Sequence, residues 1–327
     1  MNDLRAAKNE SLVSIVVPCH DEAASILAFH AAVTEAMAGA GCAHELVFVD
    51  DGSDDRTLEL LLTLARQDNR VKVVELSRNF GKEAALTAGL DHASGDAVIP
   101  MDADLQDPPG LLPVLIAEWR NGAEVVLAIR VDRQADSWLK RSTAAAFYSV
   151  FNRFAPTRIP RNAGDFRLMD RSVVDAVCQL QERNRFMKGL FAWVGFRTVQ
   201  VTYRREARLA GQSKFSGWKL WNFALEGITS FSTAPLRIWT YVGMLGAFVA
   251  ASYGLFLIID TLLYGRDVPG YASLMVVILF LGSLQLTALG VIGEYIGRSY
   301  IESKGRPRYI IRKVHRAETA GSIGDEA

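Results

Sequence analysis

The stretch Val98-Ile99-Pro100-Met101-Asp102-Ala103-Asp104-Leu105-Gln106-Asp107-Pro108-Pro109 decides the fold. An apolar run typical of a β-strand ends abruptly in three carboxylates and an amide, and the two prolines prevent the strand from continuing. Because Asp102 and Asp104 are two residues apart where the chain turns, they can converge on one Mg²⁺ or Mn²⁺, which favour such oxygen ligands and substrate phosphates. The stretch therefore predicts a metal-bound diphosphate site; the alternative is that the carboxylates end the strand and cap the helix after Pro109.

Other short apolar segments are also typical of buried strands, and each is followed by polar residues. The five expected strands cover residues 12–18, 46–49, 71–75, the opening stretch and 124–129, with helices expected to about residue 41 and over about 56–67 and 82–93. Strands that alternate with helices predict an α/β fold with a doubly wound, mainly parallel sheet, in which ligands bind beyond the carboxyl ends of the strands. Five polar strand ends in succession therefore predict one site.

Two uncharged apolar segments, at residues 238–259 and 268–293, dominate the C-terminal third. Each has the roughly 20 residues that a helix needs to cross about 30 Å of hydrocarbon. The linker between them is short, so we expect a transmembrane hairpin; the alternative is a buried helical hairpin of a soluble protein. Seven Lys and Arg residues follow the second segment over 298–316, whereas the linker carries only Arg266. This distribution predicts that both termini are cytoplasmic.

The bulk composition limits the number of domains, the kinds of binding partner and the cellular compartment that are expected. The 327 residues have room for two domains, or for one large domain with an appendage. Half of the residues are hydrophobic and the formal net charge is zero, so no attraction to nucleic acid is indicated. Three cysteines at unrelated spacings form neither a metal knuckle nor a disulfide framework, which fits a reducing compartment. The first ten residues are polar and charged, so no signal peptide is expected.

Several motifs together resemble glycosyltransferase family 2, and in particular its polyprenyl-phosphate branch of undecaprenyl-phosphate glucosyltransferases and dolichyl-phosphate mannosyltransferases. They are Pro18-Cys-His-Asp-Glu22, Asp50-Asp-Gly-Ser-Asp-Asp-Arg-Thr57, Arg78-Asn-Phe-Gly-Lys82, Asp102-Ala-Asp-Leu-Gln-Asp-Pro-Pro109, Gly293-Glu-Tyr-Ile-Gly-Arg298 and Glu302-Ser-Lys-Gly-Arg-Pro307. The resemblance covers nearly the whole chain. It implies a GT-A fold, a nucleotide-sugar donor and a divalent metal, Mg²⁺ or Mn²⁺.

The resemblance also implies a division of the chain. Residues 1–215 are expected to form a cytoplasmic GT-A domain, and residues 298–327 a basic cytoplasmic tail. Between them, residues 236–297 are expected to hold the two transmembrane helices, at about 238–260 and 270–293. The segment 216–235 places Trp218, Trp221 and other apolar side chains on one face just before the first span. It is therefore expected to be an amphipathic helix in the membrane interface.

The donor site follows from the resemblance residue by residue. Pro18, His20, Glu22 and Asp51 are expected to line the base and ribose pocket, with Asp51 accepting from the N–H of uracil. Asp102 and Asp104 are expected to serve the ribose and the metal, with Gln106 as a further metal ligand, and Lys82 and Ala103 complete the expected nucleotide-sugar site. The family usually has Tyr-Asn-Glu where this chain has His20-Asp21-Glu22, and an imidazole offers less stacking area than a phenol ring.

The expected acceptor site is basic. Guanidinium groups suit phosphate geometry, and the residues expected to bind the acceptor phosphate are Arg130, Arg133, Lys140, Arg141, Arg205, Arg208 and Lys214. Asp165 is the candidate catalytic carboxylate, either as a base or as a group that orients the cations. The phosphate of the acceptor loses its last proton with a pKa of about 6, so it is largely ionised near neutrality and hardly needs a strong base.

The sequence therefore predicts an inverting glycosyltransferase, anchored in the inner membrane, that moves a hexose or related sugar from a UDP-sugar to polyprenyl (undecaprenyl) phosphate for cell-envelope glycan modification. Its expected partners are these two substrates, the lipid bilayer and a second copy in a homo-oligomer. Alternatives are a GDP-mannose-dependent transferase, a polysaccharide synthase or a non-catalytic membrane-anchor subunit. Two spans are too few for the channel of a synthase, and intact acids argue against a degenerate subunit.

Overall fold

The computed structural model describes residues 11–130, 163–183, 185–203, 234–264 and 270–316. Its strands are β1 (Leu12–Cys19), β2 (Ala43–Asp50), β3 (Val71–Leu76), β4 (Ala97–Pro100), β5 (Val125–Arg130), β6 (Ala163–Asp170), β7 (Thr198–Tyr203) and β8 (Ile311–Arg316). Its helices are α2 (Ile26–Ala38), α3 (Thr57–Gln67), α4 (Lys82–His92), the 3₁₀ turn η1 (Pro109–Leu111), α5 (Leu112–Arg120), α7 (Arg171–Gln179), α8 (Met187–Trp193), α10 (Ala234–Tyr264) and α11 (Tyr271–Ser303). All five expected strands and the three expected helices are confirmed to within a few residues.

The eight strands form one mixed sheet with the order β7-β5-β6-β4-β1-β2-β3-β8. Strands β1 to β4 pair in parallel, as the alternation of strands and helices predicts. Strand β6 runs antiparallel between β4 and β5. Its first residues therefore lie at the same edge of the sheet as the carboxyl ends of β1 to β4. This insertion brings a late segment of the chain to the predicted site.

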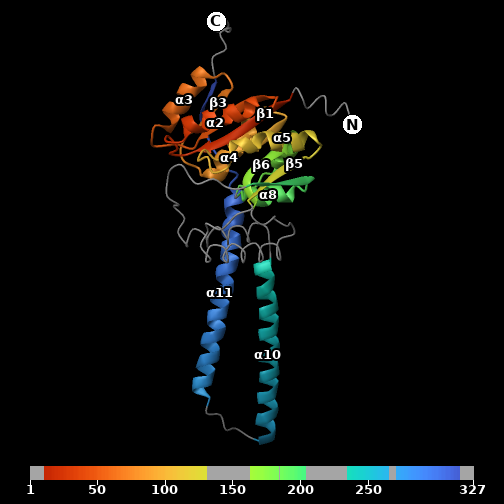
Figure 1. The fold of residues 1–327 in the computed structure, drawn as a ribbon. Helices are drawn as coiled ribbons and strands as arrows, with labels where there is room; N and C mark the ends of the chain where they lie inside the picture. Colours follow the sequence, from red (N-terminus) through yellow and green to blue (C-terminus); the bar gives the residue numbers. More distant parts are fainter. Residues whose placement is uncertain (1–10, 131–162, 184, 204–233, 265–269, 317–327) are drawn as a thin grey trace. The chain divides into compact units, whose positions relative to one another are not determined.

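Helices cover both faces of the sheet (Figure 1). On one face, α3 packs against β3 and β2, α5 packs against β5 and β6, and α2 lies against both helices. The core on this face contains Phe29, Phe48, Trp119 and Phe166, each at most 1% exposed. The rings of Phe29 and Phe48 meet edge to face. On the other face, α4 packs against β1, β2 and α7. Strands β1 to β4 are buried on both faces, which explains their nearly continuous apolar sequences.

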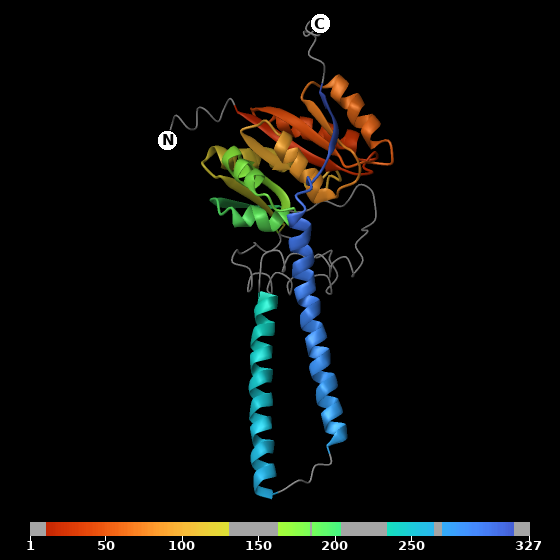
Figure 2. The same cartoon turned by 180° about the vertical axis from the view of Figure 1, so that it is seen from behind.

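Strand β8 forms one edge of the sheet beside β3, antiparallel to it, as the dark blue strand in Figure 2 shows. We expected this segment to be only a basic tail. Two of its basic side chains, those of Arg312 and His315, instead contact the carboxylate of Glu75 on β3, at 3.2 and 3.0 Å. The segment that follows the second apolar helix is therefore part of the eight-stranded sheet.

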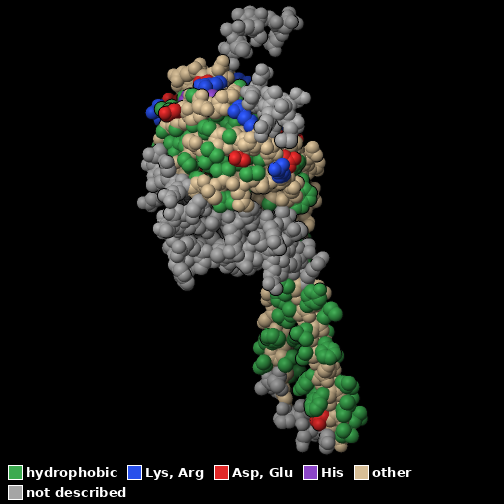
Figure 3. Space-filling view, turned by 45° about the vertical axis from the view of Figure 1, so that its right-hand side comes forward, with side chains coloured by type: hydrophobic (Ala, Val, Ile, Leu, Met, Phe, Trp, Pro, Cys, Tyr) green, Lys and Arg blue, Asp and Glu red, His purple; other side chains and the backbone are tan. Residues whose placement is uncertain are grey.

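The two long apolar helices, α10 and α11, belong to a second compact unit. They contain segments long and apolar enough to cross a membrane, Ile238–Asp260 and Leu274–Ser303. Apolar side chains all around them are exposed, among them Phe248 (71%) and Leu262 (80%), and Figure 3 shows this apolar surface from one side. A helix that is apolar all around needs lipid or a protein core to cover it. Because the described part of the chain leaves these helices uncovered, we conclude that the protein is membrane-anchored.

Some predictions concern residues outside those that the structure describes. They include residues 216–233 of the interfacial helix expected at 216–235, and most of the expected acceptor-phosphate ligands: Arg133, Lys140, Arg141, Arg205, Arg208 and Lys214. Of this set, the backbone of Arg130 is described, as the last residue of β5.

Candidate functional site

The predicted site residues gather at one edge of the sheet. His20 and Glu22 follow β1, Asp51 follows β2, and Asp102 follows β4. Pro18, the other expected base-pocket residue, is half-buried within β1. The site therefore lies at the carboxyl ends of the parallel strands, as the polar strand ends predict.

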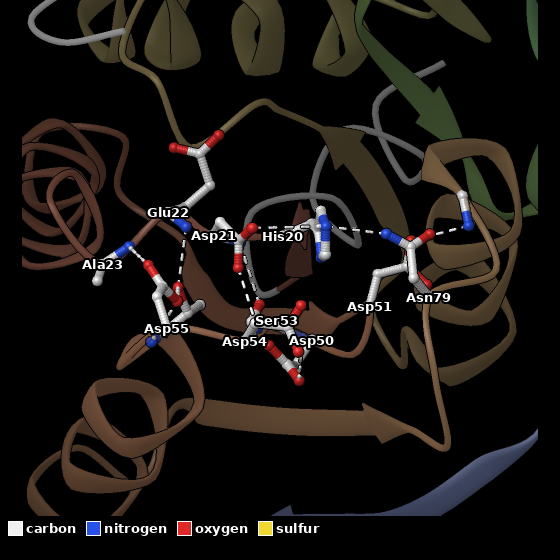
Figure 4. Close-up of polar contacts among 12 residues, drawn as sticks. His20, Asp21, Glu22, Ala23, Asp50, Asp51, Ser53, Asp54, Asp55 and Asn79 are labelled. Carbon is white, nitrogen blue, oxygen red and sulfur yellow. Dashed lines mark hydrogen bonds and ion pairs between the residues drawn. The ribbon is translucent and has the colours of Figure 1, made fainter.

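A row of polar side chains links the ends of β1 and β3 (Figure 4). The ring of His20 lies between Asp21 and Asn79, with Nε2 at 3.6 Å from the Asp21 carboxylate and 2.9 Å from Nδ2 of Asn79. Asp21 has a positive φ of 56°. Asn and Asp tolerate this conformation better than other residues with a Cβ atom, which explains how Asp can stand where the family usually has Asn. The carboxylate of Glu22 points away from this row and accepts from the hydroxyl of Ser25.

Asp51 is held by the backbone that follows β3. Its two carboxylate oxygens accept hydrogen bonds from the amides of Phe80 and Gly81, at 2.7 and 2.9 Å. Burial raises the pKa of Asp51, and these hydrogen bonds oppose the rise. We did not predict a role for its neighbour Asp50, whose Oδ1 is buried and has no hydrogen-bond partner. Burial raises the pKa of Asp50 as well.

Gly52 permits the close approach of these two loops. It has a φ of +63°, and a Cβ atom there would lie 2.5 Å from the backbone carbon of Arg78 and 2.6 Å from the amide of Asn79. We expect Gly52→Ala to lower the free energy of unfolding by at least about 2 kcal/mol and to weaken nucleotide binding, because it combines a strained φ with backbone overlap. Gly41→Ala is the control, since Gly41 has a similar φ of +61° but open space at Cβ. Equal losses in the two variants, measured by thermal unfolding, would contradict this account.

The turn after β4 carries the carboxylates of the opening stretch. Leu105 has a positive φ of 56°, which is unusual for a bulky side chain and marks a strained turn. Asp104 Oδ1 accepts from the backbone amide of Gln106 at 3.1 Å. The N-cap positions of η1 and α5 are occupied by Pro108 and Leu111, not by Asp102 or Asp104, which is evidence against the capping alternative.

This turn fits a divalent metal. The Oε1 atom of Gln106 is buried and has no hydrogen-bond partner, so it can bind a cation or accept a hydrogen bond from a ligand. Asp102, Asp104 and Gln106 all carry oxygen donors, the ligand type that suits Mg²⁺ or Mn²⁺. Within the described ranges, no group of three or more His, Cys, Asp or Glu side chains is arranged to hold a metal. Mg²⁺ in protein sites usually keeps several waters and takes further ligands from substrate phosphates.

Lys82 joins this turn to β6. Its Nζ lies 2.6 and 2.8 Å from the two carboxylate oxygens of Asp102, and 3.2 Å from Oδ2 of Asp165. Strands β4 and β6 pair with Ala97 opposite Asp170, and continuing this antiparallel register places Asp102 opposite Asp165. The ammonium group therefore neutralises two carboxylates that would otherwise repel each other.

Asp165 lies within a cluster of cations. Burial raises its pKa, but Lys188, Lys82 and Arg167 lower it further, to about 2, so Asp165 is ionised at neutral pH. Its Oδ1 is buried without a hydrogen-bond partner. Neither Lys188 nor Arg167 is predicted from the sequence, because a lone basic residue in a helix or strand gives no signal of what it faces.

Glu83 is a second buried acid beside this cluster that the sequence analysis missed. Burial and the nearby charge of Asp165 raise its pKa from 4.5 to about 8, although Lys82, Lys188 and a hydrogen bond from the Met187 amide oppose the rise. Glu83 is therefore protonated at neutral pH in the folded protein, while Asp165 is ionised. Two neighbouring acids thus hold different protonation states because their surroundings differ.

The raised pKa of Glu83 predicts a pH-dependent stability. The protonated carboxyl contributes fully to stability below its unfolded pKa of 4.5, and this contribution is lost as the pH rises toward 8. As the pH rises through this range, we expect the free energy of unfolding of Glu83→Gln to increase relative to that of the wild type by about 1 kcal/mol per pH unit. The control is Glu59→Gln on the exposed surface of α3, where burial is absent. Thermal unfolding between pH 5 and 9 tests this, and a constant difference for Glu83→Gln would refute it.

The chain is similar to known proteins over most of its length. The chain matches the family "Glycosyl transferase family 2" over residues 14–178 and the "GtrB C-terminal hairpin" over residues 234–299. It is 55% identical over 304 residues to the SfII prophage-derived bactoprenol glucosyl transferase of Shigella flexneri, covering 93% of this chain and 98% of that one. A prophage bactoprenol glucosyl transferase homolog of Escherichia coli K12 is 53% identical over 302 residues, covering 92% and 99%.

Among solved structures, glucosyl-3-phosphoglycerate synthase from Mycobacterium tuberculosis, in complex with Mn²⁺, uridine diphosphate and phosphoglyceric acid, resembles this chain loosely. The sequences are 21% identical, the match covers 70% of this chain and 80% of that one, and the TM-score is 0.46. A likeness at this level carries no argument about the site.

Proposed function

This chain belongs to glycosyl transferase family 2, and we propose that it transfers glucose from UDP-glucose to a polyprenyl phosphate such as undecaprenyl phosphate. That it is a glycosyltransferase follows from its family and its relatives. The observation that carries the proposal of glucose and a polyprenyl acceptor is the identity of 53–55% with bactoprenol glucosyl transferases over more than nine-tenths of both chains. The uridine nucleotide is what the family resemblance of the strand-end motifs implies.

The site is divided into a donor half and an acceptor half. In the proposed division, His20 and Asp51 receive the base and ribose, and the turn from Asp102 to Gln106 receives the diphosphate. Asp165, on β6, faces the acceptor with the cations around it. Given this order along one sheet edge, the sugar is proposed to lie between the two halves. A phosphate oxygen of the acceptor then attacks the anomeric carbon while the bond to the diphosphate breaks, which inverts the configuration.

Asp165 is proposed to orient cations rather than to remove a proton. The acceptor phosphate has a pKa of about 6, so a carboxylate with a pKa of about 2 accepts its proton only against a difference of about four units. Near neutrality the acceptor is already largely ionised, so the barrier lies in bringing two anions together. Lys82, Lys188 and Arg167, held by Asp165, supply positive charge at that point.

A divalent metal, when bound, neutralises the negative charge that develops on the leaving diphosphate. Asp102, Asp104 and Gln106 are the residues that we propose hold it, and either Mg²⁺ or Mn²⁺ suits them. Their contribution is to present oxygen atoms from a rigid, strained turn at the end of β4.

Both ends of the chain are proposed to lie in the cytoplasm, where nucleotide sugars are made available to the site. Helix α11 has 33 residues, or about 50 Å at 1.5 Å per residue, and its last turns carry Glu294, Arg298 and Glu302. These charges lie on the side where the basic residues that follow α11 also gather. A reporter fused after Ala327 should be cytoplasmic and one inserted near Pro269 external; the reverse result would contradict the proposal.

The proposed donor is tested by nucleotide binding to the purified full-length protein. With Mn²⁺ present, calorimetry should show that UDP and UDP-glucose bind and that GDP binds at least about tenfold more weakly, which corresponds to about 1.4 kcal/mol. Tighter binding of GDP than of UDP would overturn the uridine assignment and favour GDP-mannose as the donor.

A further inference from the structure

We propose that, until the donor binds, the ammonium group of Lys82 neutralises Asp102 in place of the metal. Metal binding then depends on the nucleotide diphosphate. This inference rests on the proposed metal role of Asp102. It adds a regulatory role for one lysine, whose ammonium group moves from Asp102 to the diphosphate when donor and metal bind.

The first observation is the position of the Lys82 ammonium group on Asp102. Nζ of Lys82 lies within 2.8 Å of both carboxylate oxygens of Asp102. A divalent cation that ligates the same carboxylate approaches its oxygens to about 2.0–2.2 Å. The two cations would then be close neighbours on one small anion and would repel each other, so metal binding at Asp102 requires Lys82 to withdraw.

The second observation is that the Lys82 side chain is exposed enough to move away from Asp102. Its side chain is 46% exposed, and it extends from the first residue of α4. It also contacts Asp165 at 3.2 Å, so it stays tied to the cluster when it leaves Asp102. Burial lowers the pKa of Lys82, but Asp102 and Asp165 raise it more strongly, so the group remains a cation throughout.

The third observation concerns the balance of charge around Asp102 and Asp165. Without the donor, Lys82 offsets the charges of two nearby carboxylates. When a diphosphate arrives, it brings anionic oxygens that suit an ammonium group, and the metal can then take over Asp102. Nucleotide binding draws Lys82 away from Asp102, and metal binding at Asp102 releases Lys82 for the diphosphate. By thermodynamic linkage, the metal and the nucleotide therefore strengthen each other's binding.

The experiment uses Mn²⁺ itself as the probe, measured from its free electron paramagnetic resonance signal with purified full-length protein, with and without UDP. Lys82→Met should bind Mn²⁺ without UDP at least about tenfold more tightly than the wild type, because one charge-assisted contact no longer competes. The same variant should bind UDP without metal more weakly. A loss of folding does not produce these two opposite changes.

Two further variants separate direct exchange from a general charge effect. Lys188→Met removes a positive charge from the same cluster, but Lys188 acts on Asp165, so its effect on Mn²⁺ affinity should be much smaller. Lys82→Arg keeps the charge and should keep the weak affinity of the wild type. Equal gains in Lys82→Met and Lys188→Met would overturn the inference.

The remaining outcomes distinguish this inference from the proposed function. If the wild type binds Mn²⁺ with UDP but Lys82→Met shows no gain without UDP, the exchange is wrong and the metal site stands. If neither protein binds Mn²⁺, even with UDP, both the metal site and the exchange are wrong.

Discussion

Replacing Asp104 by asparagine is expected to abolish sugar transfer, with a loss of at least about a thousandfold, or about 4 kcal/mol in the barrier. The asparagine side chain can still accept the hydrogen bond that Asp104 Oδ1 accepts from the Gln106 amide, so the strained turn at Leu105 is preserved. What it removes is the negative charge that a divalent cation requires. Transfer of labelled glucose to the lipid, measured at saturating metal, tests this expectation.

The control for this variant lies at the opposite edge of the sheet. Asp96 precedes β4 and accepts from the backbone amide of Leu12, far from the carboxyl ends of the strands. Asp96→Asn should keep full transfer. In the wild type, EDTA should abolish transfer and either Mg²⁺ or Mn²⁺ should restore it. Full activity in EDTA, or in Asp104→Asn, would remove the metal from the account.

Replacing Asp165 by asparagine is expected to reduce kcat by at least about a hundredfold, because the charge-assisted contacts that hold the cations facing the acceptor are lost. Affinity for UDP should change by less than about threefold, because His20 and Asp51 do not contact Asp165 in the described part of the chain. A kcat loss with retained nucleotide binding separates the acceptor half of the site from the donor half.

The pH profile distinguishes the two roles considered for Asp165. If it orients cations, both the wild type and Asp165→Asn should lose activity below about pH 6, where the acceptor phosphate becomes protonated. If it were the base, only the wild type would show a dependence on a carboxylate. Asp170→Asn is the matched control on the same strand: Asp170 caps α7 and accepts from Trp119, so its loss should lower stability and leave kcat unchanged.

The sequence predicts much of this site because the chemistry follows a regular pattern. Each buried strand from β1 to β4 ends in polar residues, and parallel strands carry those ends to one edge. Short, nearly all-apolar strands are recognisable without knowledge of their partners. The predicted proximity of Asp51 and the segment after β3 is confirmed by the hydrogen bonds to Phe80 and Gly81.

The parts that were missed depend on contacts between distant segments. Strand β8 is rich in charge and resembles a solvated tail; only its pairing with β3, more than 230 residues earlier, makes it a strand. Glu83 is an ordinary helical residue in the sequence, and its raised pKa arises from burial and from Asp165 on β6. The bridge from Lys82 to Asp165 requires the antiparallel insertion of β6, which no local pattern encodes.

The most direct test of the central claim is transfer by the purified full-length protein from UDP-[¹⁴C]glucose to undecaprenyl phosphate in detergent, with Mn²⁺. We predict a labelled lipid that forms only when the acceptor is present, with one UDP released per glucose transferred. Mild acid should cleave this product to glucose and the lipid. No labelled lipid from UDP-glucose, or a labelled lipid from GDP-mannose instead, would contradict it.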